Sequence, residues 1–171
     1  MRVSLHKHAA QMTTQHESAP LTELDTRIPL AVLLPGLAGL TPFVILSLSE
    51  ILSLGLPPVV ALLAFNTYGA VILSFVGAIW WGLAAATKQS VPKTIMFYWS
   101  VVPALIGWFA TLVPPDVGVL MLSAGFVLQW LGDAWLVRTY HGVAPGWLFP
   151  LRTILTAGVL TTMAISWWFL V

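Results

Sequence analysis

Charged side chains become rare after residue 27, and the few that remain divide the rest of the chain into long apolar runs. A transmembrane helix needs about 20 mostly apolar residues, because the hydrocarbon core of a bilayer is about 30 Å thick. Five runs meet this requirement, at about 29–53, 59–86, 94–113, 117–137 and 152–171. The pattern therefore predicts an all-α integral membrane bundle of five transmembrane helices over residues 28–171, preceded by a flexible polar tail over residues 1–27.

The composition also indicates a membrane protein. Hydrophobic residues make up 58% of the 171-residue chain and charged residues only 8%, with a mean hydropathy of +0.92. Soluble domains carry about 25% charged residues, so this chain has too little polar surface for water or for binding nucleic acid. It also has no cysteine, which excludes disulfides, thiolate metal sites and cysteine nucleophiles.

The polar tail carries no targeting signal that we recognise. It lacks the short apolar core of a secretory signal, and its acids argue against a mitochondrial presequence. Three histidines lie in it, His6, His8 and His16. We interpret them as polar residues of a flexible segment and expect no metal site.

The basic residues predict the orientation of the bundle. All seven fall in the tail or at the connections after the second and fourth spans, which lie on one side of the membrane: Arg2, Lys7, Arg27, Lys88, Lys93, Arg138 and Arg152. The opposite connections carry only acids, Glu50 and Asp116. Because basic loops favour the cytoplasmic side, we expect the N-terminus inside and the C-terminus outside.

One ionisable residue lies inside a predicted span. Asp133 follows Gln129 by about one helical turn, so the two side chains share a face of the fourth span. A charge within a membrane is costly and usually faces a partner in the bundle interior. Arg152 is the first candidate partner and Arg138 the second. We predict a structural Asp133–Arg152 clamp, with a proton carrier or an anchor for a ligand headgroup as the alternatives.

Small residues recur every four positions in the second span, at Ala70, Ser74 and Ala78. Such a stripe predicts a close helix crossing, and a ligand-facing groove is the alternative. Asn66 and Tyr68 are further polar candidates in the same span. The fifth span repeats the stripe with Thr153, Ala157 and Thr161.

The first span contains Pro35, Gly36, Gly39 and Pro42, so we expect a kink or local break near its middle. Broken helices form substrate sites in some transporters, where the two halves of the chain carry matching breaks. No matching break occurs in the second half of this sequence. The pattern therefore does not favour a transporter.

The chain is rich in tryptophan, with nine residues. Most lie near predicted membrane interfaces, where indole rings are common. Trp99, Trp108 and Trp130 lie deeper and are candidates for packing or for stacking on a flat ligand. Trp147 belongs to a short segment, 144–151, that we expect to lie at the inner interface.

Known catalytic patterns are missing from the sequence. It contains no Gly-rich phosphate loop, no His-Glu-x-x-His run, no Gly-x-Ser-x-Gly turn and no carboxylate cluster. The spans also lack the two facing histidines that would ligate a haem. We expect neither an enzyme nor a resident cofactor.

The run YGAVILSFVGAIWWGL, residues 68–83, resembles the signature of an uncharacterised family of small multi-pass membrane proteins that includes transmembrane protein sixty-nine. Supporting pieces follow in the same order, WSVVPALIGW at 99–108 and AGF at 124–126. The last pieces are Asp133, then Trp147 with Arg152 and Thr156. The resemblance covers about 34–162 and implies a helical bundle in a bacterial or mitochondrial inner membrane. The family's domain is of unknown function, so no activity is implied.

The resemblance also marks positions for a shared role. The matching residues are Tyr68, Ser74, Gly77, Trp81, Gly82, Asp133, Trp147 and Arg152. Trp80 departs from the pattern at the first position of the tryptophan pair, so the resemblance favours Trp81.

Three functions stay open. The first is a non-enzymatic assembly factor or accessory subunit of an inner-membrane complex, which implies a membrane-protein partner or a homo-oligomer and fits the small size and the small-residue stripes. The second is a binder or carrier of a flat apolar ligand, such as a quinone, porphyrin or sterol, indicated by the deep tryptophans and by Gln129 with Asp133. A proton or small-solute conduit through Asp133 is the third and has the least support.

Overall fold

A computed structural model describes residues 27–49, 51–52, 54–88 and 93–170. The predicted tail up to residue 26, with its histidines, lies outside these residues. The described helices are α2 (Leu30–Ala38), α3 (Thr41–Ser47), α4 (Pro58–Ala86), α5 (Lys93–Ala110), α6 (Pro115–Thr139) and α7 (Leu148–Leu170). Five spans are long and apolar enough to cross a membrane, with α2 and α3 together forming the first, which confirms the predicted all-α membrane bundle.

Proline determines where several helices begin. Helices α4 and α6 start at Pro58 and Pro115, where the missing N–H costs nothing because the first turn has no intrahelical acceptor for it. For the same reason Pro150 lies within the first turn of α7, which begins at Leu148. The second half of the segment predicted at 144–151 is therefore the first turn of α7 and not a separate segment, and its place at the interface stays a prediction.

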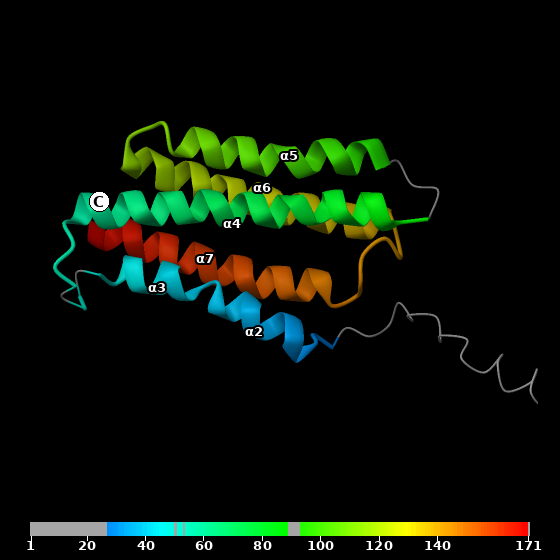
Figure 1. Cartoon of the computed structure of the whole chain (residues 1–171), viewed down its shortest axis with the longest axis horizontal. Coiled ribbons are helices and arrows are strands. Elements are labelled where there is room, and N and C mark those ends of the chain that lie inside the picture. Colours follow the sequence, from blue (N-terminus) through cyan, green and yellow to red (C-terminus); the bar gives the residue numbers. More distant parts are fainter. Residues whose placement is uncertain (1–26, 50, 53, 89–92, 171) are drawn as a thin grey trace, which may run out of the picture.

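The first span is broken at Gly39 and Leu40, close to where its prolines predict a break. The hydroxyl of Tyr68 in α4 donates to the Gly39 carbonyl at 2.9 Å and so satisfies a backbone acceptor at the break. Beyond the break, α3 buries Phe43 in the core, whereas α2 has no buried residue. Figure 1 shows α2 running away from α4 toward the end of the bundle at which the chain enters.

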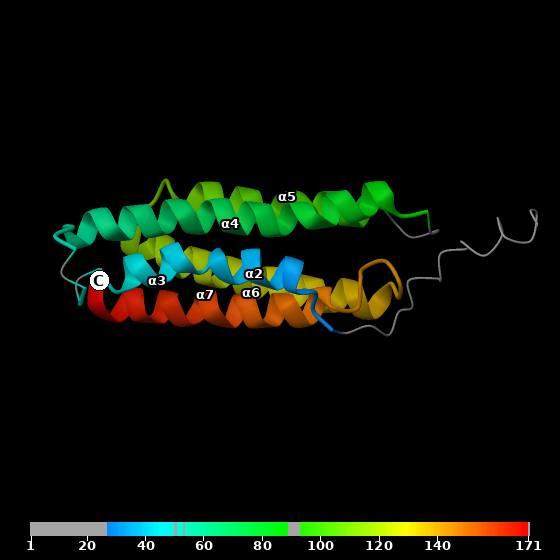
Figure 2. The same cartoon turned by 60° about the horizontal axis from the view of Figure 1, so that its bottom comes forward.

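Helix α4 is central, because it contacts α3, α5, α6 and α7, while α2 contacts mainly α7. Figure 2 shows α2 and α3 passing between α4 and α7 on one side of the bundle. Helix α5 packs closely on α4 at Gly77, where a Cβ would lie 2.7 Å from Pro103 Cγ. The face of α4 that packs on α5 therefore includes Ala70 and Gly77. Ala78 of the predicted stripe lies outside this face, because it is exposed.

The α4–α5 and α6–α7 connections lie at the same end of the bundle as the start of α2 (Figure 1). The described basic residues therefore gather at or near this end: Arg27, Lys88, Lys93, Arg138 and Arg152. Asp116 lies in the first turn of α6, at the opposite end. The charge asymmetry required by the predicted orientation is present, and the orientation itself stays a prediction.

Candidate functional site: a buried ion pair beside an apolar cavity

Asp133 of α6 is the centre of a buried polar cluster. Its Oδ1 accepts hydrogen bonds from Trp80 Nε1 at 2.6 Å and from Gln129 Nε2 at 2.7 Å. Its Oδ2 lies 3.7 Å from Nη1 of Arg152 in α7. All four side chains are buried. The structure therefore contains the predicted Asp133–Arg152 pair, with Gln129 on the same face of α6.

Arg152 also binds the backbone of α4. Its Nη2 donates to the Val76 carbonyl at 2.6 Å. Since Asp133 accepts from Trp80, which is also on α4, the ion pair connects α4, α6 and α7. A buried ion pair is stabilised by additional hydrogen bonds to its charged groups, and these bonds to α4 provide part of that stabilisation.

Trp80 was missed by the sequence reasoning, which favoured its neighbour. Trp80 is 1% exposed and donates to Asp133, whereas Trp81 is 53% exposed and makes an edge-to-face contact with Phe97. Adjacent helical residues differ by about 100° around the axis, so one of the pair faces the bundle and the other faces lipid. Trp80, and not Trp81, is therefore the tryptophan of the polar cluster.

The remaining polar candidates lie outside this cluster. Asn66 donates to the Pro115 carbonyl at 2.7 Å, and it lies about 21 Å from Trp80 along α4 at 1.5 Å per residue. Ser74 donates to the Ala70 carbonyl of its own helix at 2.7 Å, and Tyr68 holds the break in the first span. Asn66 and Tyr68 therefore connect different elements of the fold, whereas Ser74 bonds only within α4. In the part of the chain that the structure describes, no three His, Cys, Asp or Glu side chains are grouped to hold a metal ion.

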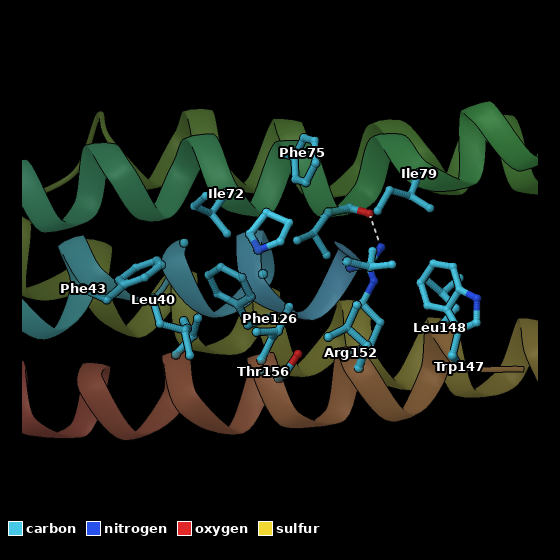
Figure 3. Close-up of a pocket in the computed structure, with 18 of the residues that line it drawn as sticks. Leu40, Phe43, Ile72, Phe75, Ile79, Phe126, Trp147, Leu148, Arg152 and Thr156 are labelled. Atoms are coloured by element: carbon cyan, nitrogen blue, oxygen red, sulfur yellow. Dashed lines mark hydrogen bonds between the residues drawn. The ribbon is translucent and has the colours of Figure 1, made fainter. Parts of the chain in front are cut away.

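An apolar cavity of about 380 Å³ lies between the first span, α4 and α7 (Figure 3). It lies where α2, which precedes the break, diverges from the bundle. Its polar side chains, Trp147, Arg152 and Thr156, come from α7 and the residue before it. Its apolar walls include Pro35, Gly36, Leu40 and Phe43 of the first span, Ile72, Phe75 and Ile79 of α4, Phe126 of α6, and Leu151, Leu155 and Val159 of α7.

The ion pair and the cavity share one wall. Arg152 and Val76 line the cavity, whereas Asp133, Gln129 and Trp80 do not and lie behind the Arg152 side chain. Figure 3 shows Arg152 reaching from α7 toward α4, with its hydrogen bond crossing to that helix. The same guanidinium therefore closes the cluster on one side and borders the cavity on the other.

The deep tryptophans do not line this cavity. Trp99 packs against Gly132, where a Cβ would overlap the indole ring. Trp130 donates to Thr153 at 3.0 Å, and Trp108 is 56% exposed. Stacking of a flat ligand on these three rings, which the sequence indicated, is therefore not supported by their positions. Trp147 is the tryptophan that borders the cavity.

Residues 28–168 match a protein family described as "Protein of unknown function (DUF3429)". The chain belongs to this family. It is also 34% identical over 159 residues to Transmembrane protein 69 of Xenopus tropicalis, an alignment that covers 88% of this chain and 60% of that relative. This chain thus spans about 60% of the length of that relative. No solved structure matches.

Membership of the DUF3429 family confirms the resemblance found in the sequence, and it supports a multi-pass membrane protein without supplying a molecular function. Three residues that carried the resemblance, Trp147, Arg152 and Thr156, meet at the cavity. The sequence signals for the cavity itself were Pro35 and Gly36, which contributed to the predicted break and form part of the cavity wall.

Proposed function

We propose that this DUF3429 protein is a non-enzymatic membrane protein that binds an apolar small molecule in the cavity between the first span, α4 and α7. The cavity carries the proposal. Its volume of about 380 Å³ lies within the range of about 300–1,000 Å³ typical of ligand pockets. Its walls are aliphatic and aromatic with a few convergent polar groups, the combination by which small-molecule sites fix an apolar ligand and its orientation.

Two hydrogen bonds hold the walls of the cavity in place, and one wall extends to the lipid-facing surface. Arg152 bonds α7 to α4, and Tyr68 bonds α4 to the break in the first span, so these elements have fixed positions. Phe75 lines the cavity and is also 65% exposed, so the wall continues onto the lipid-facing surface of α4. An apolar molecule dissolved in the bilayer therefore has a route to the cavity that avoids water.

Photolabelling tests this proposal. The full chain in lipid nanodiscs is irradiated with an uncharged photoreactive apolar probe, and the labelled residues are mapped by mass spectrometry. We expect labelling of the cavity walls that falls at least severalfold in Ile72→Phe, because the larger ring fills the cavity. Val71→Phe is the matched control, since Val71 is 59% exposed and does not line the cavity. Labelling spread evenly over lipid-facing surfaces and unchanged in Ile72→Phe would refute the proposal.

A second candidate, an accessory subunit of a membrane complex, is favoured by one face of α7. Thr153, Ala157 and Thr161 are all exposed, and Ala157 and Thr161 face away from the bundle, whereas Thr153 also accepts a hydrogen bond from Trp130 of α6. Small residues on an outward face allow another helix to approach closely. Ala157→Leu should then reduce cross-linking to a partner chain or a second copy in native membranes, while Ala64→Leu on exposed α4 surface should not. A protein that cross-links to nothing would count against this role.

A further inference from the structure

Three donors on the α7 side of the cavity have unused hydrogen-bonding capacity. An arginine has five N–H donors, and Arg152 uses one, on Nη2, in the described structure, although only 5% of the residue is exposed. Its Nη1 has no hydrogen-bond partner there, but it is buried and faces Asp133 Oδ2 at 3.7 Å, so a ligand in the cavity would meet Nη2, which bonds to the lining residue Val76. The hydroxyl of Thr156 donates to no carbonyl among the described residues. Three other threonine hydroxyls of α7 do donate to carbonyls of that helix, those of Thr153, Thr161 and Thr162. The indole N–H of Trp147 likewise has no acceptor among the residues that the structure describes.

We propose that Arg152 and Thr156 bind the carbonyl oxygen of an uncharged amphipathic ligand of the quinone type, with Trp147 bordering its polar ring. This inference rests on the proposed function and names its ligand class. Figure 3 shows the three side chains on the α7 side, facing Ile72 and Ile79 across the cavity. Arg152 and Thr156 are one turn apart and therefore lie on one face of α7.

The charge of the cluster indicates that the ligand is uncharged. Arg152 is already paired with Asp133, so the buried pair has no net charge. An anionic head would bring a second negative charge close to Asp133 in a medium of low dielectric, where like charges repel strongly. A cationic head group would be repelled by the positive charge of the guanidinium. A carbonyl oxygen accepts from those donors and adds no net charge.

The shape of the cavity indicates how the ligand is oriented relative to the membrane. Arg152 lies about 6 Å from the start of α7 at 1.5 Å per residue, so the polar wall is near the membrane interface. The positive end of the α7 macrodipole is at the same place and favours a partial negative charge. The cavity then continues past Leu40 toward Phe43 and Val159, which are apolar. A polar ring near the interface and an apolar chain lying deeper fit this arrangement.

The size and lining of the cavity favour a single ring over a tetrapyrrole. About 380 Å³ is near the lower limit of the range for ligand pockets, which is about 300–1,000 Å³. The lining residues include no His, Cys, Met or Tyr, the side chains that ligate haem iron.

Competition against the photoreactive probe tests the head-group assignment. The competitors for the full chain in nanodiscs are a benzoquinone with a decyl chain, decylbenzene, which lacks the carbonyls, and decanoate, which is anionic. We expect the quinone to compete about tenfold more tightly than decylbenzene, and decanoate to compete less well than the quinone. Thr156→Val should weaken the quinone about two- to tenfold and leave decylbenzene unchanged, because it removes one hydroxyl at constant shape. Thr161→Val is the matched control, since its hydroxyl already bonds Ala157 and is exposed.

The outcomes separate the two proposals. Failure of all three competitors, together with labelling that is not confined to the cavity, would overturn cavity binding and the proposed function with it. Decylbenzene competing as well as the quinone, or a quinone affinity unchanged in Thr156→Val, would leave cavity binding intact and overturn the head-group assignment. Tightest competition by decanoate would overturn the uncharged ligand.

Discussion

Replacing Trp80 with Phe tests the clamp that joins α4 to α6. The substitution keeps an aromatic ring but removes the indole N–H that donates to Asp133 Oδ1 at 2.6 Å. Trp81→Phe is a matched control of identical chemistry one residue away, where the side chain is 53% exposed. The two variants therefore differ only in the direction in which the side chain faces.

The structure gives the expected magnitudes. A hydrogen bond to a charged group contributes about 1.5–3 kcal/mol. Trp80 is 1% exposed, so the smaller ring also leaves a cavity, which costs about 1 kcal/mol more. We expect Trp80→Phe to lower the free energy of unfolding by about 3 kcal/mol, and Trp81→Phe to lower it by less than about 1 kcal/mol.

Unfolding by SDS in bicelles, followed by far-UV circular dichroism, measures both values without relying on tryptophan fluorescence. A double-mutant cycle adds a check, because in an Asp133→Asn background the amide oxygen still accepts but carries no charge, so the cost of Trp80→Phe should fall to about 2 kcal/mol. Equal losses in Trp80→Phe and Trp81→Phe would show that the hydrogen bond to Asp133 does not stabilise the bundle.

Three further predictions follow from particular contacts. Gly132→Ala should destabilise the protein by about 1–3 kcal/mol in the SDS assay, because the new Cβ overlaps an indole ring of α5, whereas Gly82→Ala, with nothing within 4 Å, should be neutral. Tyr68→Phe should lower the hydrogen-exchange protection of the first span by about 1 kcal/mol, and unchanged protection would contradict its role at the break. Since the chain has no cysteine, single variants report orientation: an impermeant maleimide on intact bacteria should label Thr111→Cys but not Lys88→Cys, and the reverse would invert the predicted topology.

The number and approximate limits of the spans could be predicted because charged residues and prolines mark their ends. The start of the last span could not, since Pro150 is compatible either with an interfacial segment or with a first helical turn. The break in the first span was predictable from its prolines and glycines. The divergence of α2 was not, because it depends on how few contacts that helix makes with the others.

The ion pair was predictable because one acid and one base lie near the same depth of the membrane in adjacent spans. The role of Trp80 was not, because a helix that is apolar on all sides gives no signal for its rotation about its axis. The cavity was not predictable either, since it requires residues from four spans whose arrangement no single run reveals. The spare donors of Arg152 and Thr156 become apparent only after every hydrogen bond of α7 has been assigned.

The ion pair and the cavity meet at one side chain, Arg152. Arg152 is held by Asp133 and Val76, which fixes its position, and it keeps N–H donors that those partners do not use. A residue so placed both stabilises the bundle and presents a polar group to an apolar site.

Native mass spectrometry of the protein, extracted from its own membrane in mild detergent, shows whether the cavity holds a ligand. We predict a bound small molecule, seen as a discrete added mass in the wild type and in Val71→Phe but lost in Ile72→Phe. The released molecule should be uncharged. A protein that carries no added mass, or one that keeps the same added mass in Ile72→Phe, would contradict ligand binding in the cavity between the first span, α4 and α7.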